Sequence, residues 1–67
     1  MAVARVTEIT ASSTKSIEDA IEEGLKRAAR TLRGITGLEV ISLKAKVDKG
    51  RIQEYRVSLK ITFVLED

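Results

Sequence analysis

Apolar residues between positions 17 and 32 recur at steps of three and four, which predicts one amphipathic helix. They are Ile17, Ala20, Ile21, Gly24, Leu25, Ala28, Ala29 and Leu32. Ser13 or Ser16 is suited to cap the start of this helix, and Gly34 is expected to stop it in a left-handed conformation. Gly24 in a helix interior costs about 0.5–1 kcal/mol relative to alanine, so we expect another element to approach its backbone closely.

The polar face of this helix is charged in two blocks. Acidic residues (Glu18, Asp19, Glu22 and Glu23) come first, and basic residues (Lys26, Arg27, Arg30 and Arg33) follow. This order complements the helix dipole. It also predicts the pairs Glu22–Lys26 and Glu23–Arg27, which are four residues apart.

Beyond Gly34 the apolar period changes to two, which predicts a pair of strands. The alternating residues are Ile41, Leu43, Ala45 and Val47, then Tyr55, Val57, Leu59, Ile61, Phe63 and Leu65. Because both sets are odd-numbered, a three-residue loop from Asp48 to Gly50, with Gly50 left-handed, places them on one face. The predicted register sets Leu43 opposite Tyr55, Ile41 opposite Val57 and Glu39 opposite Leu59. Leu38 and Val40 then fall on the other face.

Residues 3–10 form a weaker alternating segment, so the expected order is strand, helix, strand, strand. The prediction is a single α+β domain over residues 1–67, in which one helix lies across a three-stranded antiparallel sheet and the long hairpin curls around it. Long strands covered by a single helix leave sheet edges with unpaired backbone groups, which must be protected within the chain or paired with another chain. We therefore interpret the chain as an assembling subunit.

Chain length and composition support self-association. A chain of 67 residues buries only about 60% of the surface that its unfolded form exposes. Small domains of this kind usually depend on disulfides, a metal or an oligomer. The sequence contains no cysteine and no histidine, which excludes disulfides and ordinary zinc sites. Oligomerisation is the remaining reinforcement.

Several function classes find no support in the sequence. Without Cys or His, the common nucleophile–base pairs are absent, and carboxylates beside basic residues on strands are typical surface pairs, so we expect no enzyme. The acids Glu39, Asp48 and Glu54 are scattered and lack the spacing of a calcium loop, so no metal site is predicted.

Nucleic acid and membrane partners are not expected either. The net charge is +2, and a basic patch of Lys44, Lys46, Arg56 and Lys60 would have only two aromatic residues in the whole chain to assist it, Tyr55 and Phe63. Both belong to the apolar set. No segment is apolar enough to span a membrane, and residues 1–5 lack the apolar stretch of a signal peptide, so we expect a cytoplasmic protein.

Four segments resemble the dodecin family along nearly the whole chain. They are "EITASS", the helix "AIEEGLKRAARTLR", the strand "GLEVISLKAKV" and the closing "EYRVSLKITFVLED" with its Phe63, Leu65, Glu66 ending. The resemblance implies a strand–helix–strand–strand subunit of a hollow homododecamer. It also implies a protein that binds flavins in pairs and serves as a flavin store or buffer.

The resemblance also implies which positions form the flavin site. The family's stacking tryptophan falls on Gly37, and a glutamine that bonds the flavin edge falls on Arg56. A basic residue that meets a nucleotide phosphate falls on Lys44 and keeps its charge, whereas a second such arginine falls on Val64. Aromatic stacking of this kind is worth roughly 0.5–1.5 kcal/mol beyond the buried area.

Two interpretations follow for the ligand. In the first, the protein binds riboflavin or FMN in a rebuilt pocket, with Gly37, Leu38, Lys44 and Arg56 at the site and Arg56 pairing with a phosphate or ring carbonyl. In the second, the shell has lost flavin and binds another small anionic ligand or is a structural assembly. Independently of any ligand, a glycine at a strand start often marks a bulge or a close backbone approach, and Lys44 and Arg56 fit surface or interface charges.

Overall fold

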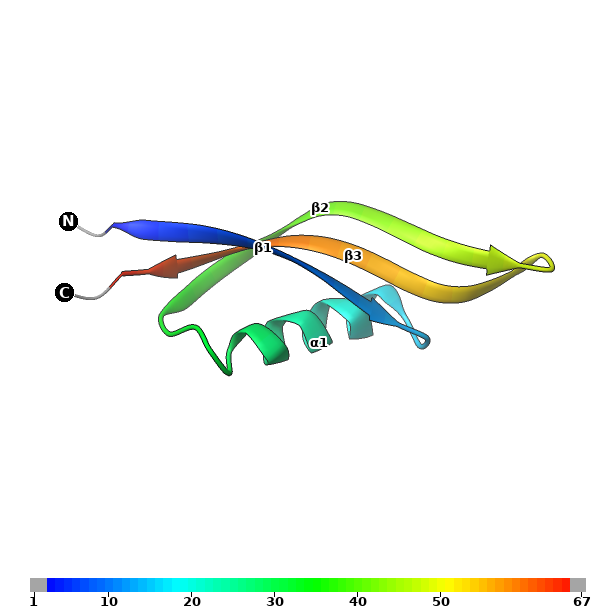
Figure 1. Cartoon of the computed structure of the whole chain (residues 1–67), viewed down its shortest axis with the longest axis horizontal. Helices are drawn as coiled ribbons and strands as arrows, with labels where there is room; N and C mark the ends of the chain where they lie inside the picture. Colours follow the sequence, from blue (N-terminus) through cyan, green and yellow to red (C-terminus); the bar gives the residue numbers. More distant parts are fainter. Residues whose placement is uncertain (1–2, 66–67) are drawn as a thin grey trace.

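The computed structural model describes residues 3–65, and they form the predicted order of strand, helix, strand and strand (Figure 1). The elements are β1 (Ala4–Ser13), α1 (Ile17–Ala28), β2 (Ile35–Asp48) and β3 (Arg51–Val64). All strand pairs are antiparallel and β3 is central, in the order β1-β3-β2. The predicted α+β fold class is therefore confirmed, and the first strand is longer than residues 3–10. Glu66, the last residue of the ending that resembles dodecins, lies outside the described residues.

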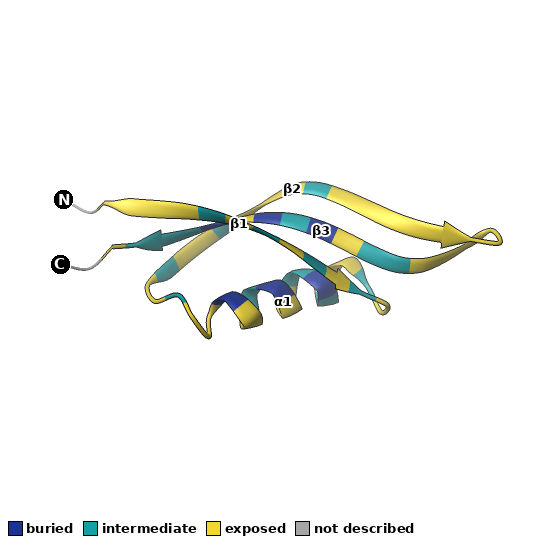
Figure 2. Ribbon diagram, in the orientation of Figure 1, coloured by how far each residue is buried: buried dark blue, intermediate teal, exposed yellow. Residues whose placement is uncertain are grey.

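The helix packs on β1 and β3 and buries a small core between them (Figure 2). The buried apolar residues of the described chain are Ala20, Ala28, Val57, Leu59 and Ile61. Gly24 faces this core, and a Cβ built on it would lie 3.0 Å from Leu59 Cδ1 and 3.1 Å from the Ala11 Cβ. The predicted close approach to Gly24 is confirmed, because the helix lies directly on the sheet at this residue.

The helix begins as predicted but ends earlier. Ser16 is the N-cap, and its hydroxyl accepts a hydrogen bond of 2.9 Å from the Asp19 N–H. The helix ends at Ala28 and continues as a turn, in which the Leu32 N–H bonds to the Ala28 carbonyl. Gly34 has the predicted left-handed φ of 74°, but it terminates this turn and not the helix. The Gly34 carbonyl accepts a 2.9 Å hydrogen bond from the Val64 N–H, which ties the end of this turn to the end of β3.

The predicted ion pairs along the helix are not formed. Among residues 3–65, the single salt bridge joins Glu54 and Arg56, both of β3. Glu22–Lys26 and Glu23–Arg27 therefore remain separate in this structure. Exposed pairs of this kind contribute little to stability, so their absence leaves the helix dependent on its packed face.

The loop of the β2–β3 hairpin differs from the prediction. Asp48 pairs with Arg51, so the loop is the two residues Lys49 and Gly50, both left-handed with φ of 51° and 75°. A two-residue turn with both residues left-handed matches the twist of the flanking strands better than an ordinary type I or II turn does. The odd-numbered residues Leu43, Ala45 and Val47 nevertheless share a face with the odd-numbered residues 55–63 of β3, because Gln53 is an extra residue on β3. This bulge, and not a three-residue loop, therefore places these apolar residues of the two strands on the same face.

The predicted register was wrong, and one face assignment changes with it. Leu43 lies opposite Val57 and Glu39 lies opposite Lys60, while Ile41 is an extra residue in a second bulge. Because the bulge inserts one residue, even-numbered residues face the core before it and odd-numbered residues face the core after it. Leu38 and Val40 therefore lie opposite the buried Ile61 and Leu59, on the core side of the sheet and not on the far face as predicted. Leu38 packs against the core.

Candidate functional site

The face of the sheet opposite the helix is defined here as the outer face. Its residues form rows across the strands: Gly37, Thr62 and Val6; Glu39, Lys60 and Glu8; Ser42, Ser58 and Thr10; Lys44, Arg56 and Ser12; and finally Lys46 and Glu54. Every residue of these rows is exposed or half-buried. The outer face is polar along most of its length, so it is a solvent-facing surface and not a second core.

Gly37 leaves open space at one end of the outer face. A Cβ built on it meets no heavy atom within 4 Å, and its φ lies outside the left-handed region. A bulge does precede it, at Thr36, and its only close neighbour in the described chain is the paired strand β3. Neither backbone conformation nor packing within one subunit requires a glycine here. The position is free to carry a side chain or to leave room for a bound molecule.

Lys44 and Arg56 lie directly opposite each other on β2 and β3. Together with Ala45 and Lys46 they line a shallow hollow of about 380 Å³. Like charges placed directly opposite each other in a sheet repel one another. A negatively charged group bound in this hollow would relieve the repulsion, so the hollow has the chemistry of an anion site.

Glu54 partly neutralises the hollow. Its Oε1 accepts a 2.9 Å hydrogen bond from the Arg56 Nε–H. The Arg56 side chain in this ion pair is 53% exposed. This guanidinium is the main reason that the pKa of Glu54 lies below its ordinary value. The carboxylate thus fixes the direction of the guanidinium, while Lys44 and Lys46 have no acidic partner within 4.0 Å among the described residues.

The four residues expected at the flavin site, which are Gly37, Leu38, Lys44 and Arg56, do not come together in one chain. Gly37 lies opposite Thr62, whereas Lys44 lies opposite Arg56, six residues further along β3. At about 3.3 Å per residue, this separation is roughly 20 Å. Leu38 faces the core on the other side of the sheet. A ligand touching both Gly37 and the cations would need residues from more than one subunit.

A groove that sequence reasoning did not predict runs between α1 and the unpaired edge of β1. It has a volume of about 540 Å³, and its lining residues include Ile9, Ala11, Gly24, Ala28 and Leu32, with Glu23 and Arg27 at its rim. The small residues of the helix were visible in the sequence. What the sequence did not reveal is that β1 is an edge strand, so the groove beside these small residues lies along an unpaired edge of the sheet.

Between residues 3 and 65, no group of three acidic, histidine or cysteine side chains is arranged to hold a metal ion. Over the same residues, α1 is too short and too polar to cross a membrane.

Comparisons with known proteins agree on one family. The family model for dodecin matches residues 3–66. A dodecin of Thermus thermophilus is 32% identical over 65 residues, which cover 97% of this chain and 94% of that protein. The crystal structure of an arginine-to-alanine mutant of T. thermophilus dodecin superposes with a TM-score of 0.95 at 31% identity, with both chains covered completely.

A second structural relative is a calcium-chelating antigen of Mycobacterium tuberculosis named calcium dodecin. Its TM-score is 0.81 at 32% identity, and the match covers 96% of this chain and 91% of that one. The match over almost the full length, in sequence and in structure, supports a small binding protein as the class of function. This chain belongs to the dodecin family.

Proposed function

We propose that this protein is a homo-oligomeric binding protein that stores or buffers a flavin, FMN before riboflavin. The observation that carries the proposal is the outer face, where open space at Gly37 and the opposed cations Lys44 and Arg56 lie on one surface of a dodecin fold. The open space accommodates a planar ring, and the cations suit a phosphate. FMN carries a phosphate and riboflavin does not, so FMN is the better match.

The distance between these two features leads to the oligomeric part of the proposal. One subunit presents them roughly 20 Å apart, so each ligand would take its ring contacts from one subunit and its phosphate contacts from another. The hollow homododecamer implied by the family resemblance supplies repeated copies of both. Its assembly would also cover apolar side chains that a single chain leaves exposed, among them Val3, Val6 and Leu65.

A second candidate function follows from Gly37 itself. Without an aromatic side chain the site offers no stacking surface, and stacking supplies roughly 0.5–1.5 kcal/mol in such contacts. A shell of this kind would bind another small anionic ligand at the cations, or none. The two candidates differ in whether a planar ring contributes to binding.

The test is a titration of the purified protein into FMN and into riboflavin, followed by quenching of flavin fluorescence, with light scattering on the same samples. We expect an oligomer that quenches FMN more strongly than riboflavin. Gly37→Trp should tighten both ligands by about 2- to 13-fold, the equivalent of one stacking contact. Arg56→Ala combined with Lys44→Ala should weaken FMN and leave riboflavin nearly unchanged, because only FMN has a phosphate.

Two results would overturn the proposal. An intact oligomer that quenches neither flavin, even with tryptophan at position 37, would favour the shell that has lost flavin. A stable monomer at micromolar concentration would exclude a site shared between subunits.

A further inference from the structure

One carboxylate, that of Glu54, lies beside the hollow that Lys44, Lys46 and Arg56 line. Lys44 lies opposite Arg56 and Lys46 lies opposite Glu54, so the four side chains occupy two adjacent rows of the outer face. The carboxylate does not bond to the lysine directly opposite it. Within residues 3–65 its salt bridge joins it to Arg56, two residues along the same strand, at 2.9 Å. Glu54 is thus held at a cation that an anion in the hollow would contact.

The bond to Glu54 uses part of the guanidinium that a ligand would need. The Arg56 Nε–H donates to the Glu54 Oε1, and a phosphate is recognised by two N–H groups side by side. An anion that approaches the edge bearing Nε–H must displace the carboxylate. An anion that takes the terminal N–H groups leaves the carboxylate in place, where its negative charge repels the ligand. In both geometries the charge of Glu54 opposes the bound anion.

The bond between Glu54 and Arg56 can be exchanged. The side chains are 28% and 53% exposed, so solvent and solutes reach both. Exposed ion pairs contribute little free energy, because water screens them and long side chains lose freedom in forming them. A multiply charged anion in the hollow also meets Lys44 and Lys46, which gives it contacts that the single carboxylate does not make.

The carboxyl group already responds to the cations of the hollow. The pKa of Glu54 lies below its ordinary value, mainly because Arg56 donates a hydrogen bond to it, with smaller contributions in the same direction from the Ser12 hydroxyl and the charge on Lys46. Coupling between two binding events is reciprocal. If the cations favour the charged form of Glu54, an anion bound to the same cations disfavours it.

We propose that Glu54 is an internal competitor at this hollow: its carboxylate and a bound phosphate or other multiply charged anion compete for the Arg56 guanidinium, so Glu54 limits the affinity of the hollow for anions. The ligand is then released more readily, which suits a protein that stores or buffers it. This inference rests on the anion-binding part of the function proposed above, and it does not depend on the flavin ring.

The experiment compares the original protein with Glu54→Gln by calorimetric titration with inorganic pyrophosphate at neutral pH. Glutamine keeps an oxygen that accepts the Arg56 Nε–H bond but removes the negative charge. We expect pyrophosphate to bind roughly 1.5- to 5-fold more tightly to the variant, which is the range that exposed ion pairs imply. In an Arg56→Gln background the same substitution should gain no more than about 1.5-fold, because no guanidinium remains to be competed for.

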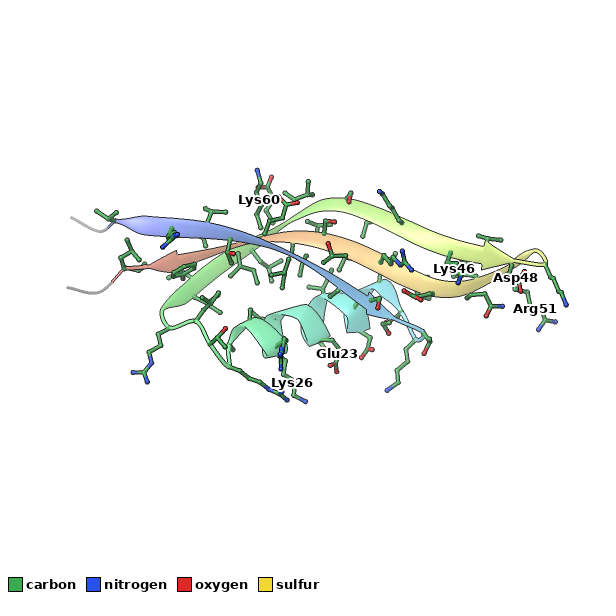
Figure 3. All side chains as sticks on the ribbon, in the orientation of Figure 1. Glu23, Lys26, Lys46, Asp48, Arg51 and Lys60 are labelled. Atoms are coloured by element: carbon green, nitrogen blue, oxygen red, sulfur yellow. The ribbon has the colours of Figure 1, made fainter. Side chains whose placement is uncertain are left out.

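The matched control is Glu39→Gln, which removes the same charge from the same face of the sheet. Glu39 lies opposite Lys60, four residues from Arg56 along β3 and therefore roughly 13 Å away. Figure 3 shows Lys60 far from Lys46 along the sheet. In about 0.1 M salt this separation exceeds the screening length of about 10 Å, so the control should bind pyrophosphate like the original protein. Circular dichroism on each sample establishes that the variants are folded.

The pH dependence gives a second readout, with sulfate as the probe. Sulfate keeps both charges as the solution is acidified, whereas a phosphate monoester gains a proton at about pH 6. The advantage of Glu54→Gln over the original protein should be constant near neutral pH and should narrow below about pH 4.5, where Glu54 of the original protein takes up a proton. Asp48, which faces Arg51 in the next outer row, titrates in both proteins and cancels in the comparison, and α1 lies on the other side of the sheet.

The outcomes separate this inference from flavin storage. Pyrophosphate that binds Glu54→Gln no more tightly than the original protein overturns the inference, and so does an equal gain in Glu39→Gln or in the Arg56→Gln background. If neither the original protein nor Glu54→Gln binds pyrophosphate, the hollow is not an anion site and the inference falls with it. If pyrophosphate binds as expected while neither flavin is quenched, flavin storage is refuted and the role of Glu54 stands.

Discussion

Replacing Gly24 with alanine is expected to destabilise the protein, although alanine is the better helix former. A Cβ at this position would lie 3.0 Å from Leu59 Cδ1, 3.1 Å from the Ala11 Cβ and 3.5 Å from Ile9 Cδ1. Leu59 is fully buried, and the Ala11 Cβ is fixed to the backbone of β1. Neither neighbour is the free end of an exposed side chain, so the helix itself would have to move away from the sheet.

Two opposing magnitudes decide the sign of this effect. Alanine gains about 0.8–1 kcal/mol over glycine in a helix interior. Overpacking of a close-packed core typically costs about 1–3 kcal/mol. With two contacts at or near 3.0 Å, one from β3 and one from β1, we take about 2 kcal/mol for the cost. The net loss is about 1 kcal/mol, or roughly 4–8 °C in the midpoint of thermal unfolding for a chain of this size.

The assay is thermal unfolding followed by circular dichroism at one fixed protein concentration, because the stability of an oligomer depends on concentration. Gly37→Ala is the matched control, since a Cβ there meets nothing within 4 Å. In a strand, alanine should gain about 0.5–1 kcal/mol over glycine. A midpoint that rises for Gly24→Ala would refute the reasoning, because it would show that the core yields to the added methyl group.

Three further predictions concern the helix cap, a carboxylate and an exposed valine near the end of β2. Ser16→Ala should lower stability by about 1 kcal/mol because the helix loses its N-cap bond, whereas Thr14→Ala should leave the unfolding midpoint unchanged. Arg56→Gln should raise the pKa of Glu54 toward its ordinary value, as measured by a carboxyl NMR titration. Because the folded-state pKa of Glu54 is lowered, the stabilisation by this pair is present above about pH 4.5 and disappears as the pH falls through the folded-state pKa. An unchanged Glu54 pKa in the variant would contradict this explanation. Val47→Ser should leave the circular dichroism spectrum unchanged while light scattering detects weaker assembly, because Val47 is 61% exposed within one chain and contributes little to its core.

Periodicity was sufficient for the order of the elements and for the helix face, because a repeat of 3.6 or 2 residues survives small local irregularities. The register of the hairpin did not follow from it. Bulges at Ile41 and Gln53 each insert one residue, and nothing in their side chains distinguishes a bulged position from a paired one. Leu38 shows the consequence, since one unseen bulge moved it from the outer face to the core.

The candidate site could be predicted only as a set of positions. Gly37 and Lys44 were identified from a resemblance to other chains, and a resemblance does not place residues in space. Their separation along the outer face depends on the strand register, which the sequence did not provide. The α1–β1 groove was missed for a related reason, because strand order is not encoded in the period of any one strand.

The position of Gly37 explains how the outer face of this dodecin fold, where we propose a ligand site, can change separately from the core. The core that holds α1 on the sheet is made from buried residues on the helix side, and Gly37 lies on the other side of the sheet with no neighbour within 4 Å. A change there alters no contact of that core, so it costs the subunit little stability. The cations Lys44 and Arg56 are likewise exposed and outside the core. Selection on the ligand can therefore act on the outer face while selection on folding acts on the helix side of the same strands.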